Sequence, residues 1–172
     1  MKDELERLYQ TTYASVVRFL YRKVWDADRA EDLAQEVFIR AMAHRPEKPR
    51  AWVFAVAANL ARDEARSAIR RRRHLTLLTN EPSVLSAPET PVDEAVEKDE
   101  RMELVHEALA ELTPRDREVL LLWDAGMSYP EIAEQSGLAV GAVGTTLARA
   151  RKRLVEVYDR QEAGRKLHAA HS

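Results

Sequence analysis

The sequence predicts an all-α protein built from two small helical domains on a flexible linker. Three observations lead to this expectation. Alanine, leucine, arginine and glutamate dominate the 172 residues, only five glycines occur, and β-branched runs are rare, so helix is the default state. Apolar residues recur at helical spacing in several long segments. Between these segments, residues 75–98 are rich in proline, serine, threonine and acids, as linkers are.

Composition excludes several classes of protein. The chain lacks cysteine, which rules out a disulfide framework and a thiolate zinc site. No apolar stretch approaches the roughly 18–20 residues that a membrane span requires, and the acidic, amphipathic N-terminus is unlike a signal peptide. The five histidines have no metal-ligand spacing, and no phosphate-binding glycine loop or nucleophile motif occurs. We therefore expect a cytoplasmic protein that is not an enzyme and needs no cofactor.

Three helices are predicted in residues 1–74. The first ends near Asp26, and its apolar positions are Leu5, Leu8, Tyr9, Val16, Leu20 and Val24. Asp28 and Glu31 resemble an acidic capping box that starts a second helix reaching about Met42. Its predicted buried face is Ala30, Leu33, Val37 and Ala41. Two prolines make residues 44–49 a loop.

The third helix is predicted over about residues 50–72, and a further helix follows the linker over about residues 99–112. Core candidates in the third helix are Trp52, Val53, Val56, Leu60 and Ile69. Residues from about 159 to 172 are polar, and we expect them to fray.

Residues 113–154 carry the start and stop signals of a helix-turn-helix. Thr113 is a good N-cap, Pro114 suits the first helical position, and Asp116 stands where a capping box places an acid. Ser128 and Glu131 repeat this pattern. The chain reversals are predicted at Gly126 and Gly137.

The last helix of this segment has an apolar stripe and a basic one. The apolar positions are Val140, Val143, Leu147 and Leu154, and the basic ones largely off that stripe are Arg149, Arg151, Lys152 and Arg153. A helix of this kind can bury one face and offer another to DNA. The net charge of −2 does not oppose this interpretation, because basic residues cluster at 66–74 and 149–153 while acids cluster at 81–103.

Three stretches in this order resemble bacterial sigma factors of the extracytoplasmic-function (ECF) group. Residues 30–38, AEDLAQEVF, are similar to the family's polymerase-binding segment. Residues 49–63, PRAWVFAVAANLARD, are similar to its promoter −10 segment, and residues 112–154 to its −35 reader. The resemblance covers nearly all of residues 1–158. It implies a sigma-2-like domain over 1–74, an acidic linker over 75–98 and a sigma-4-like domain over 99–158.

The resemblance assigns polymerase binding to the second helix. A polar stripe beside the buried one suits a basic helical partner, which the resemblance implies is the clamp coiled coil of the polymerase β′ subunit. The candidate residues are Asp32, Gln35, Glu36 and Phe38. The alternative is a solvated face with local salt bridges, each worth a few tenths of a kcal/mol, and Phe38 also fits a core position.

The −10 element is assigned to the third helix. Asn59 stands mid-helix, where asparagine is a poor helix former but can hydrogen-bond a base edge. The candidates are Asn59, Arg62, Arg66, Arg70 and Arg71. In the alternative interpretation, Asn59 satisfies a buried backbone group and the arginines pair with Asp63 and Glu64.

The −35 element is assigned to the last helix, whose first turns would reach base edges. The candidates are Ala142, Gly144, Thr145, Thr146, Arg149, Arg151 and Lys152. Relatives usually carry basic residues where this chain has GAVGTT, and Gly144 costs about 1 kcal/mol of helix propensity relative to alanine.

The implied partners are core RNA polymerase, through β′ and the β flap, together with promoter DNA and an anti-sigma factor. The protein is expected to be monomeric when free. The rival interpretation is a stand-alone helix-turn-helix regulator, which would be a dimer on palindromic DNA and would not need both residues 30–38 and 49–63.

Overall fold

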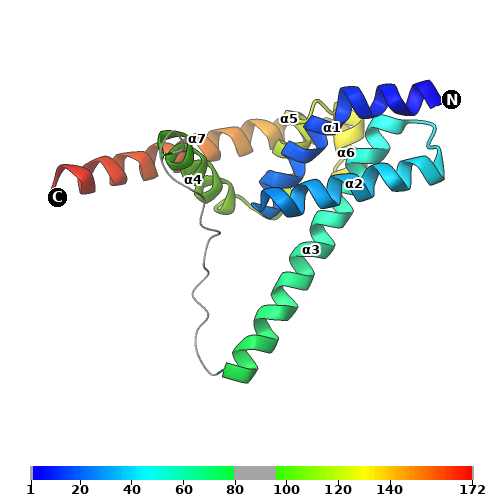
Figure 1. Ribbon diagram of the computed structural model, residues 1–172. Coiled ribbons are helices and arrows are strands. Elements are labelled where there is room, and N and C mark those ends of the chain that lie inside the picture. Colours follow the sequence, from blue (N-terminus) through cyan, green and yellow to red (C-terminus); the bar gives the residue numbers. More distant parts are fainter. Residues whose placement is uncertain (1, 80–95, 172) are drawn as a thin grey trace. The chain divides into compact units, whose positions relative to one another are not determined.

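A computed structural model of the protein describes residues 2–79 and 96–171, in which all regular structure is helical (Figure 1). The chain divides into two compact units, residues 1–89 and 90–172. Both are helical, as the sequence predicts. Among the described residues, none of the helices combines the length and apolarity that crossing a membrane requires.

The first unit consists of α1 (Lys2–Val24), α2 (Ala27–His44) and α3 (Pro49–Thr79), which all pack against one another. Its core is formed by apolar side chains from all three helices, including Val16, Leu20, Val37, Val53 and Phe54. The predicted buried face of α2 is confirmed, since its four members are at most 2% exposed.

The start of α2 differs from the capping box expected at Asp28. Asp26 is the N-cap, with extended backbone (φ −134°) and a carboxylate that accepts a hydrogen bond of 3.0 Å from the Arg29 N–H. The helix can begin here because Trp25 takes a left-handed conformation (φ 55°) that turns the chain out of α1. At the other end of α2, Arg45 is left-handed (φ 45°) and its N–H bonds the Ala41 carbonyl.

The third helix is longer than predicted and continues to Thr79. Figure 1 shows its outer half extending beyond α1 and α2 of the same unit. Ile69 was expected in the core, but its side chain is 51% exposed. The expectation failed because helical spacing continues past the point where the neighbouring helices end.

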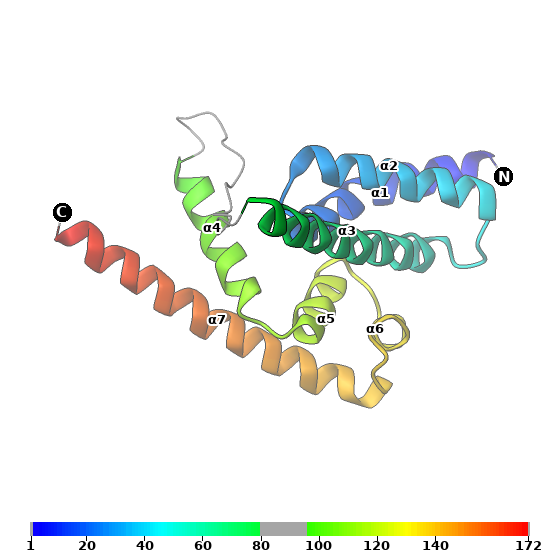
Figure 2. The ribbon, with the colours of Figure 1, turned by 90° about the horizontal axis from the view of Figure 1, so that it is seen from below.

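The second unit consists of α4 (Val96–Ala110), α5 (Pro114–Asp124), α6 (Tyr129–Ser136) and α7 (Val140–Ala170). In Figure 2, α7 runs along the length of the unit, and α4, α5 and α6 all pack against it. The core contains Val119, Leu122, Ile132, Val143 and Leu147. Of the predicted apolar stripe of α7, Val140 is an exception, being 50% exposed.

The predicted N-caps and glycine turns of the helix-turn-helix are confirmed, but Asp116 does not complete a capping box, because its carboxylate binds Arg149. The Thr113 hydroxyl accepts from the Asp116 N–H at 3.1 Å. Ser128 and Glu131 form a reciprocal capping box, with Ser128 N–H donating to the Glu131 carboxylate at 2.8 Å. Gly126 (φ 83°) and Gly137 (φ 71°) supply left-handed turns.

The last helix differs from the expectation of a frayed end at residues 159–172, because α7 continues to Ala170. Side chains of this extension reach the acids of α4 and its end. Arg160 lies 2.6 Å from Glu111, and Arg165 lies 3.3 Å from Glu103 and 3.1 Å from Glu107. The partners are 49–62 residues away in the sequence, so no local pattern could indicate them.

Candidate polymerase and nucleic-acid interfaces

The polar stripe predicted on α2 is present at the surface. Asp32 and Gln35 are exposed, and Glu36 is half-buried and forms an ion pair with Arg40 one turn later. The helical period places Ile39 on the same side as these three residues, and its side chain is 60% exposed. We name Asp32, Gln35, Glu36 and Ile39 the α2 face.

The structure corrects the assignment of Phe38. Its side chain is only 6% exposed, and its ring packs edge-on against Tyr9 at 5.2 Å and in a tilted arrangement against Tyr13 at 5.7 Å. Phe38 is therefore a core aromatic of the first unit and not part of its exposed surface. The exposed apolar residue that the sequence analysis left out is Ile39, and its seven-residue spacing from Asp32 was the signal that could have found it.

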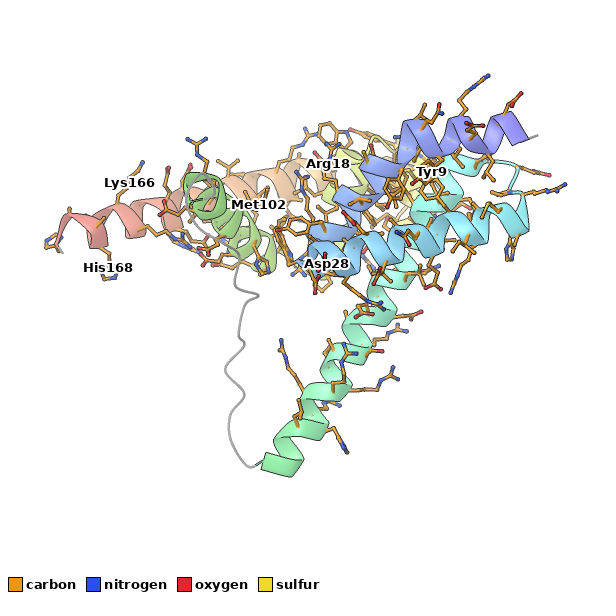
Figure 3. All side chains as sticks on the ribbon, viewed as in Figure 1. Tyr9, Arg18, Asp28, Met102, Lys166 and His168 are labelled. Carbon is orange, nitrogen blue, oxygen red and sulfur yellow. The ribbon has the colours of Figure 1, made fainter. Side chains whose placement is uncertain are left out.

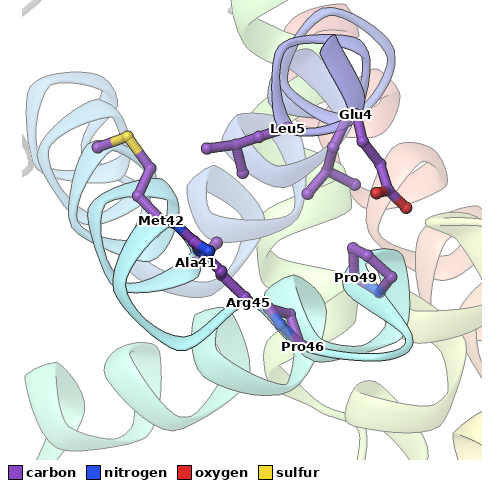
Figure 4. Close-up of a pocket in the computed structure, with 8 residues that line it drawn as sticks. Glu4, Leu5, Ala41, Met42, Arg45, Pro46 and Pro49 are labelled. Carbon is purple, nitrogen blue, oxygen red and sulfur yellow. The ribbon is translucent and has the colours of Figure 1, made fainter. Parts of the chain in front are cut away.

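A pocket of about 460 Å³ lies between α1 and the loop that joins α2 to α3. Figure 4 shows Leu5 and Glu4 of α1 facing Met42, Pro46 and Pro49 across it. Beside this loop, the ring of His44, the last residue of α2, lies 5.6 Å from the Trp52 ring of α3. Trp52 is half-buried, so it borders the loop instead of filling the core as predicted.

The helical period gathers most of the −10 candidates of α3 on one side. Asn59, Arg62, Arg66 and Arg70 are separated by three or four residues each, and Arg73 continues the series. We name these five residues the α3 basic face. Figure 3 shows long side chains standing off the outer half of α3. Arg73 belongs to the run of arginines at residues 70–73, for which the sequence also favours nucleic-acid contact.

Asn59 is exposed, and its Oδ1 accepts a hydrogen bond of 2.6 Å from Arg62. The alternative in which Asn59 satisfies a buried backbone group is therefore excluded. Arg66 is 73% exposed and lies 3.8 Å from Asp63, and Arg70 donates to the Ser67 hydroxyl at 3.1 Å. These are weak local contacts between exposed groups, which an anionic ligand can replace.

Arg71 is not on the α3 basic face. It lies on the opposite side of the helix, 3.6 Å from Glu64. Glu64 is also 2.7 Å from Arg29 of α2, and this hydrogen bond holds the pKa of the Glu64 carboxyl below its ordinary value. Arg71 therefore lies beside the ion pair of Glu64 with Arg29, which joins α3 to α2.

On α7 the structure separates exposed candidates from buried ones. Thr146 is 5% exposed and faces the core, which corrects its assignment to DNA. Ala142 and Gly144 are half-buried, whereas Thr145 and Lys152 are exposed. The helical period places two more exposed residues on the same side, Gly141 one turn before Thr145 and Ala148 between Thr145 and Lys152. We name Gly141, Thr145, Ala148 and Lys152 the α7 outer face.

The two arginines predicted for the −35 element flank this face and contact α5. Arg149 lies 2.6 Å from Asp116, and this hydrogen bond raises the pKa of its guanidinium above the ordinary value. The Arg151 guanidinium lies 3.8 Å from the centre of the Trp123 ring. Lys152 is thus the cation that the outer face itself presents.

No group of three or more potential metal ligands occurs among residues 2–79 and 96–171.

Comparison with known proteins agrees with this geometry. Residues 8–73 match the profile of Sigma-70 region 2, and residues 102–154 match that of Sigma-70, region 4. The ECF RNA polymerase sigma factor SigL of Mycobacterium tuberculosis is 34% identical over 151 residues, which cover 83% of this chain and 82% of SigL. The ECF RNA polymerase sigma factor SigM of Bacillus subtilis is 29% identical over 161 residues, covering 91% and 96%.

Among solved structures, the chain is similar to the sigma factor RpoE of Bartonella quintana, determined in complex with the anti-sigma factor NepR. The TM-score is 0.65 at 25% identity, over 92% of this chain and 98% of RpoE. Sequence and fold therefore lead to one conclusion: the chain belongs to the ECF RNA polymerase sigma factors of the sigma-70 family.

Proposed function

We propose that this ECF sigma factor recruits core RNA polymerase to promoters through three surfaces, one for the polymerase and two for DNA. The sigma factor itself carries out no bond chemistry. The observation that carries the proposal furthest is the α3 basic face, where four arginines and an exposed amide lie along one side of a projecting helix. This arrangement suits a single nucleic-acid strand, because the cations follow its phosphates and the amide can hydrogen-bond a base.

The α2 face is the proposed contact for polymerase. Acidic and amide groups surround the exposed Ile39, so the surface suits a basic helix that also offers an apolar side chain. The β′ clamp coiled coil is the expected partner. Only Glu36 is engaged in a local ion pair on this face, and at 46% exposure that pair can be exchanged at low cost.

The α3 basic face is the proposed contact for the melted −10 strand, and assists melting by holding one strand apart from the duplex. Arg71, paired with Glu64, is left out of this assignment.

The α7 outer face is the proposed contact for the −35 duplex in its major groove. Its exposed methyl groups on Thr145 and Ala148 suit thymine methyls, while Lys152 suits a phosphate or a guanine edge. A surface with one cation predicts strong reliance on groove shape and apolar contact.

Further partners follow from family membership. We expect the second unit to contact the β flap, an anti-sigma factor to inhibit the protein, and the free protein to be a cytoplasmic monomer. The structural neighbour RpoE is itself in complex with an anti-sigma factor, which supports the second expectation.

The experiment is run-off transcription with purified core polymerase on a promoter library, comparing wild type with Asp32→Arg/Glu36→Arg. A control variant, Asp3→Arg/Glu6→Arg, changes net charge equally at exposed sites on α1. We expect transcripts from a shared −35/−10 pair with wild type and control, and their loss in the α2 variant. DNA binding without core binding or transcripts would favour a stand-alone regulator.

A further inference from the structure

A buried carboxylate lies next to the α7 outer face, the proposed contact for the −35 duplex. The Asp116 side chain, in the first turn of α5, is 8% exposed. Its two oxygens accept hydrogen bonds from one guanidinium, with Arg149 Nη2 at 2.6 Å from Oδ1 and Nε at 3.4 Å from Oδ2. The contact joins α5 to α7 and fixes the guanidinium by one edge.

The other edge of this guanidinium is available. Arg149 is 62% exposed, and because the group is planar, binding through Nε and Nη2 turns Nη1 away from the carboxylate. Along α7, Arg149 stands one turn after Thr145 and one turn before Lys152 and Arg153, beside the α7 outer face. When DNA binds at the α7 outer face, Nη1 of Arg149 can donate a hydrogen bond to an acceptor on the DNA.

A carboxylate at this position weakens DNA binding unless it also orients a side chain that contacts DNA. DNA is a polyanion, so a negative charge on a DNA-binding unit opposes docking by simple electrostatics. The outer face carries one cation, Lys152, and a long arginine side chain loses rotamer freedom when it binds. An arginine held in place beforehand loses less of that freedom on binding.

We propose that Asp116 is a positioning residue for promoter binding, holding Arg149 so that its outer edge contacts an acceptor of the −35 duplex. The inference rests on the proposed role of α7 as the −35 reader. Two acceptors share the required chemistry, a phosphate oxygen and the edge of a guanine.

Loss of charge and loss of positioning predict opposite effects of an Asp116 substitution on DNA affinity. Asp116→Asn removes a negative charge, so charge alone predicts tighter DNA binding, whereas loss of positioning predicts weaker binding. We would measure holoenzyme affinity for a promoter and for the same promoter with a scrambled −35 element. The variants are Asp116→Asn, Arg149→Ala, Arg149→Lys and the double Asp116→Asn/Arg149→Ala. Glu111→Gln is the matched control, because Glu111 also pairs with arginines of α7, at 2.6 Å from Arg160.

We expect Asp116→Asn and Arg149→Ala each to weaken −35-dependent affinity about tenfold, on the order of one charge-assisted contact. The double variant should be no weaker than Arg149→Ala, and Arg149→Lys should lose most of the contact because an ammonium cannot bind two oxygens side by side. Glu111→Gln should bind as wild type does. If Arg149→Ala lowers by about one the slope of the logarithm of the binding constant against the logarithm of salt concentration, the acceptor is a phosphate. If it instead abolishes the preference at one base pair of the −35 element, the acceptor is a guanine.

The proposal is overturned if Asp116→Asn binds the −35 element as tightly as wild type or tighter. It is also overturned if the variants lower only the melting temperature while the affinity of the folded protein is unchanged, since the pair would then be a structural brace. If Asp116→Asn does not fold, Arg149→Lys decides between these results. Wild-type holoenzyme that ignores the −35 element would reject the proposed function itself.

Discussion

Gly144 of α7 lies next to Tyr129, the first residue of α6, and this neighbour decides what substitution of the glycine does. A Cβ at this position would lie 3.4 Å from the Tyr129 ring, an ordinary van der Waals separation. Gly144→Ala should therefore stabilise the second unit by about 0.5–1 kcal/mol, because alanine loses less backbone entropy in a helix. Chemical unfolding would measure the gain.

The control is Gly164→Ala on the same helix, where an added Cβ meets nothing within 4 Å. Equal gains at both positions are expected. A loss at Gly144 alone would mean that Tyr129 needs the space that glycine leaves.

The hydrogen bond between Glu64 and Arg29 should make the free energy of unfolding of the first unit depend on pH. Its pKa is lowered chiefly by the hydrogen bond from Arg29 and further by Arg71. A depressed folded pKa means that the unfolded chain binds more protons, so this stabilisation is present above the ordinary pKa of 4.5 and is lost as pH falls through the folded value.

Replacement by Glu64→Gln should cost at most about 1 kcal/mol at pH 7, since Arg29 is 44% exposed and solvent weakens the pair. The difference from wild type should shrink below pH 4.5. Unfolding curves between pH 7 and 3 would show this, with the more exposed Asp63→Asn, at 71%, as a control that changes little. A difference independent of pH would contradict the assignment.

At the scale of elements, the capping box of α6 is the feature that the sequence specifies most completely. The Ser128 hydroxyl accepts from the Glu131 N–H at 3.4 Å while the Glu131 carboxylate accepts from Ser128. Ser128→Ala should destabilise the second unit by about 1 kcal/mol. The same change at the other end of the helix, Ser136→Ala, only removes a bond to the Ile132 carbonyl and should stay within about 0.5 kcal/mol. Thermal unfolding of both variants checks the contrast.

The extension of α7 makes a second prediction at this scale. Arg165 contacts two carboxylates of α4, whereas the neighbouring Lys166 pairs at 3.4 Å with Glu162 of its own helix. Figure 3 labels Lys166 on this part of α7. Arg165→Ala should therefore speed amide hydrogen exchange in α4, with a cost of up to about 1 kcal/mol that salt reduces. Lys166→Ala should leave α4 unchanged, and equal effects on α4 would contradict the pairing.

The starts of α5 and α6 were predictable because a cap is a local interaction, as Thr113 and Ser128 show, whereas α2 begins after Asp26 and not at the expected Asp28. The rotation of a helix about its axis is set by distant neighbours. That is why Phe38 and Thr146 were assigned to binding surfaces although both face the core. The same cause separates Arg71 from Arg70, since consecutive residues of a helix point in different directions. The length of α7 was missed because its partners come from α4.

For the molecule as a whole, the division into two compact units predicts independent folding. Each unit has its own buried core, and the proposed −10 and −35 surfaces lie on different units. Cleavage at a protease site inserted within residues 80–95 should leave both halves folded, with unchanged melting temperatures.

Promoter binding should nevertheless suffer from that cut. While the chain is intact, engagement of one DNA element makes binding of the second intramolecular, and such linkage can raise overall affinity by about 10²–10⁴. The cleaved pair, assayed with core polymerase, should therefore require far higher protein concentrations for the same transcription. The uncleaved insertion variant controls for the added site. Full activity of the cleaved halves at the original concentration would show that polymerase, and not the chain connection, holds the two units on the promoter.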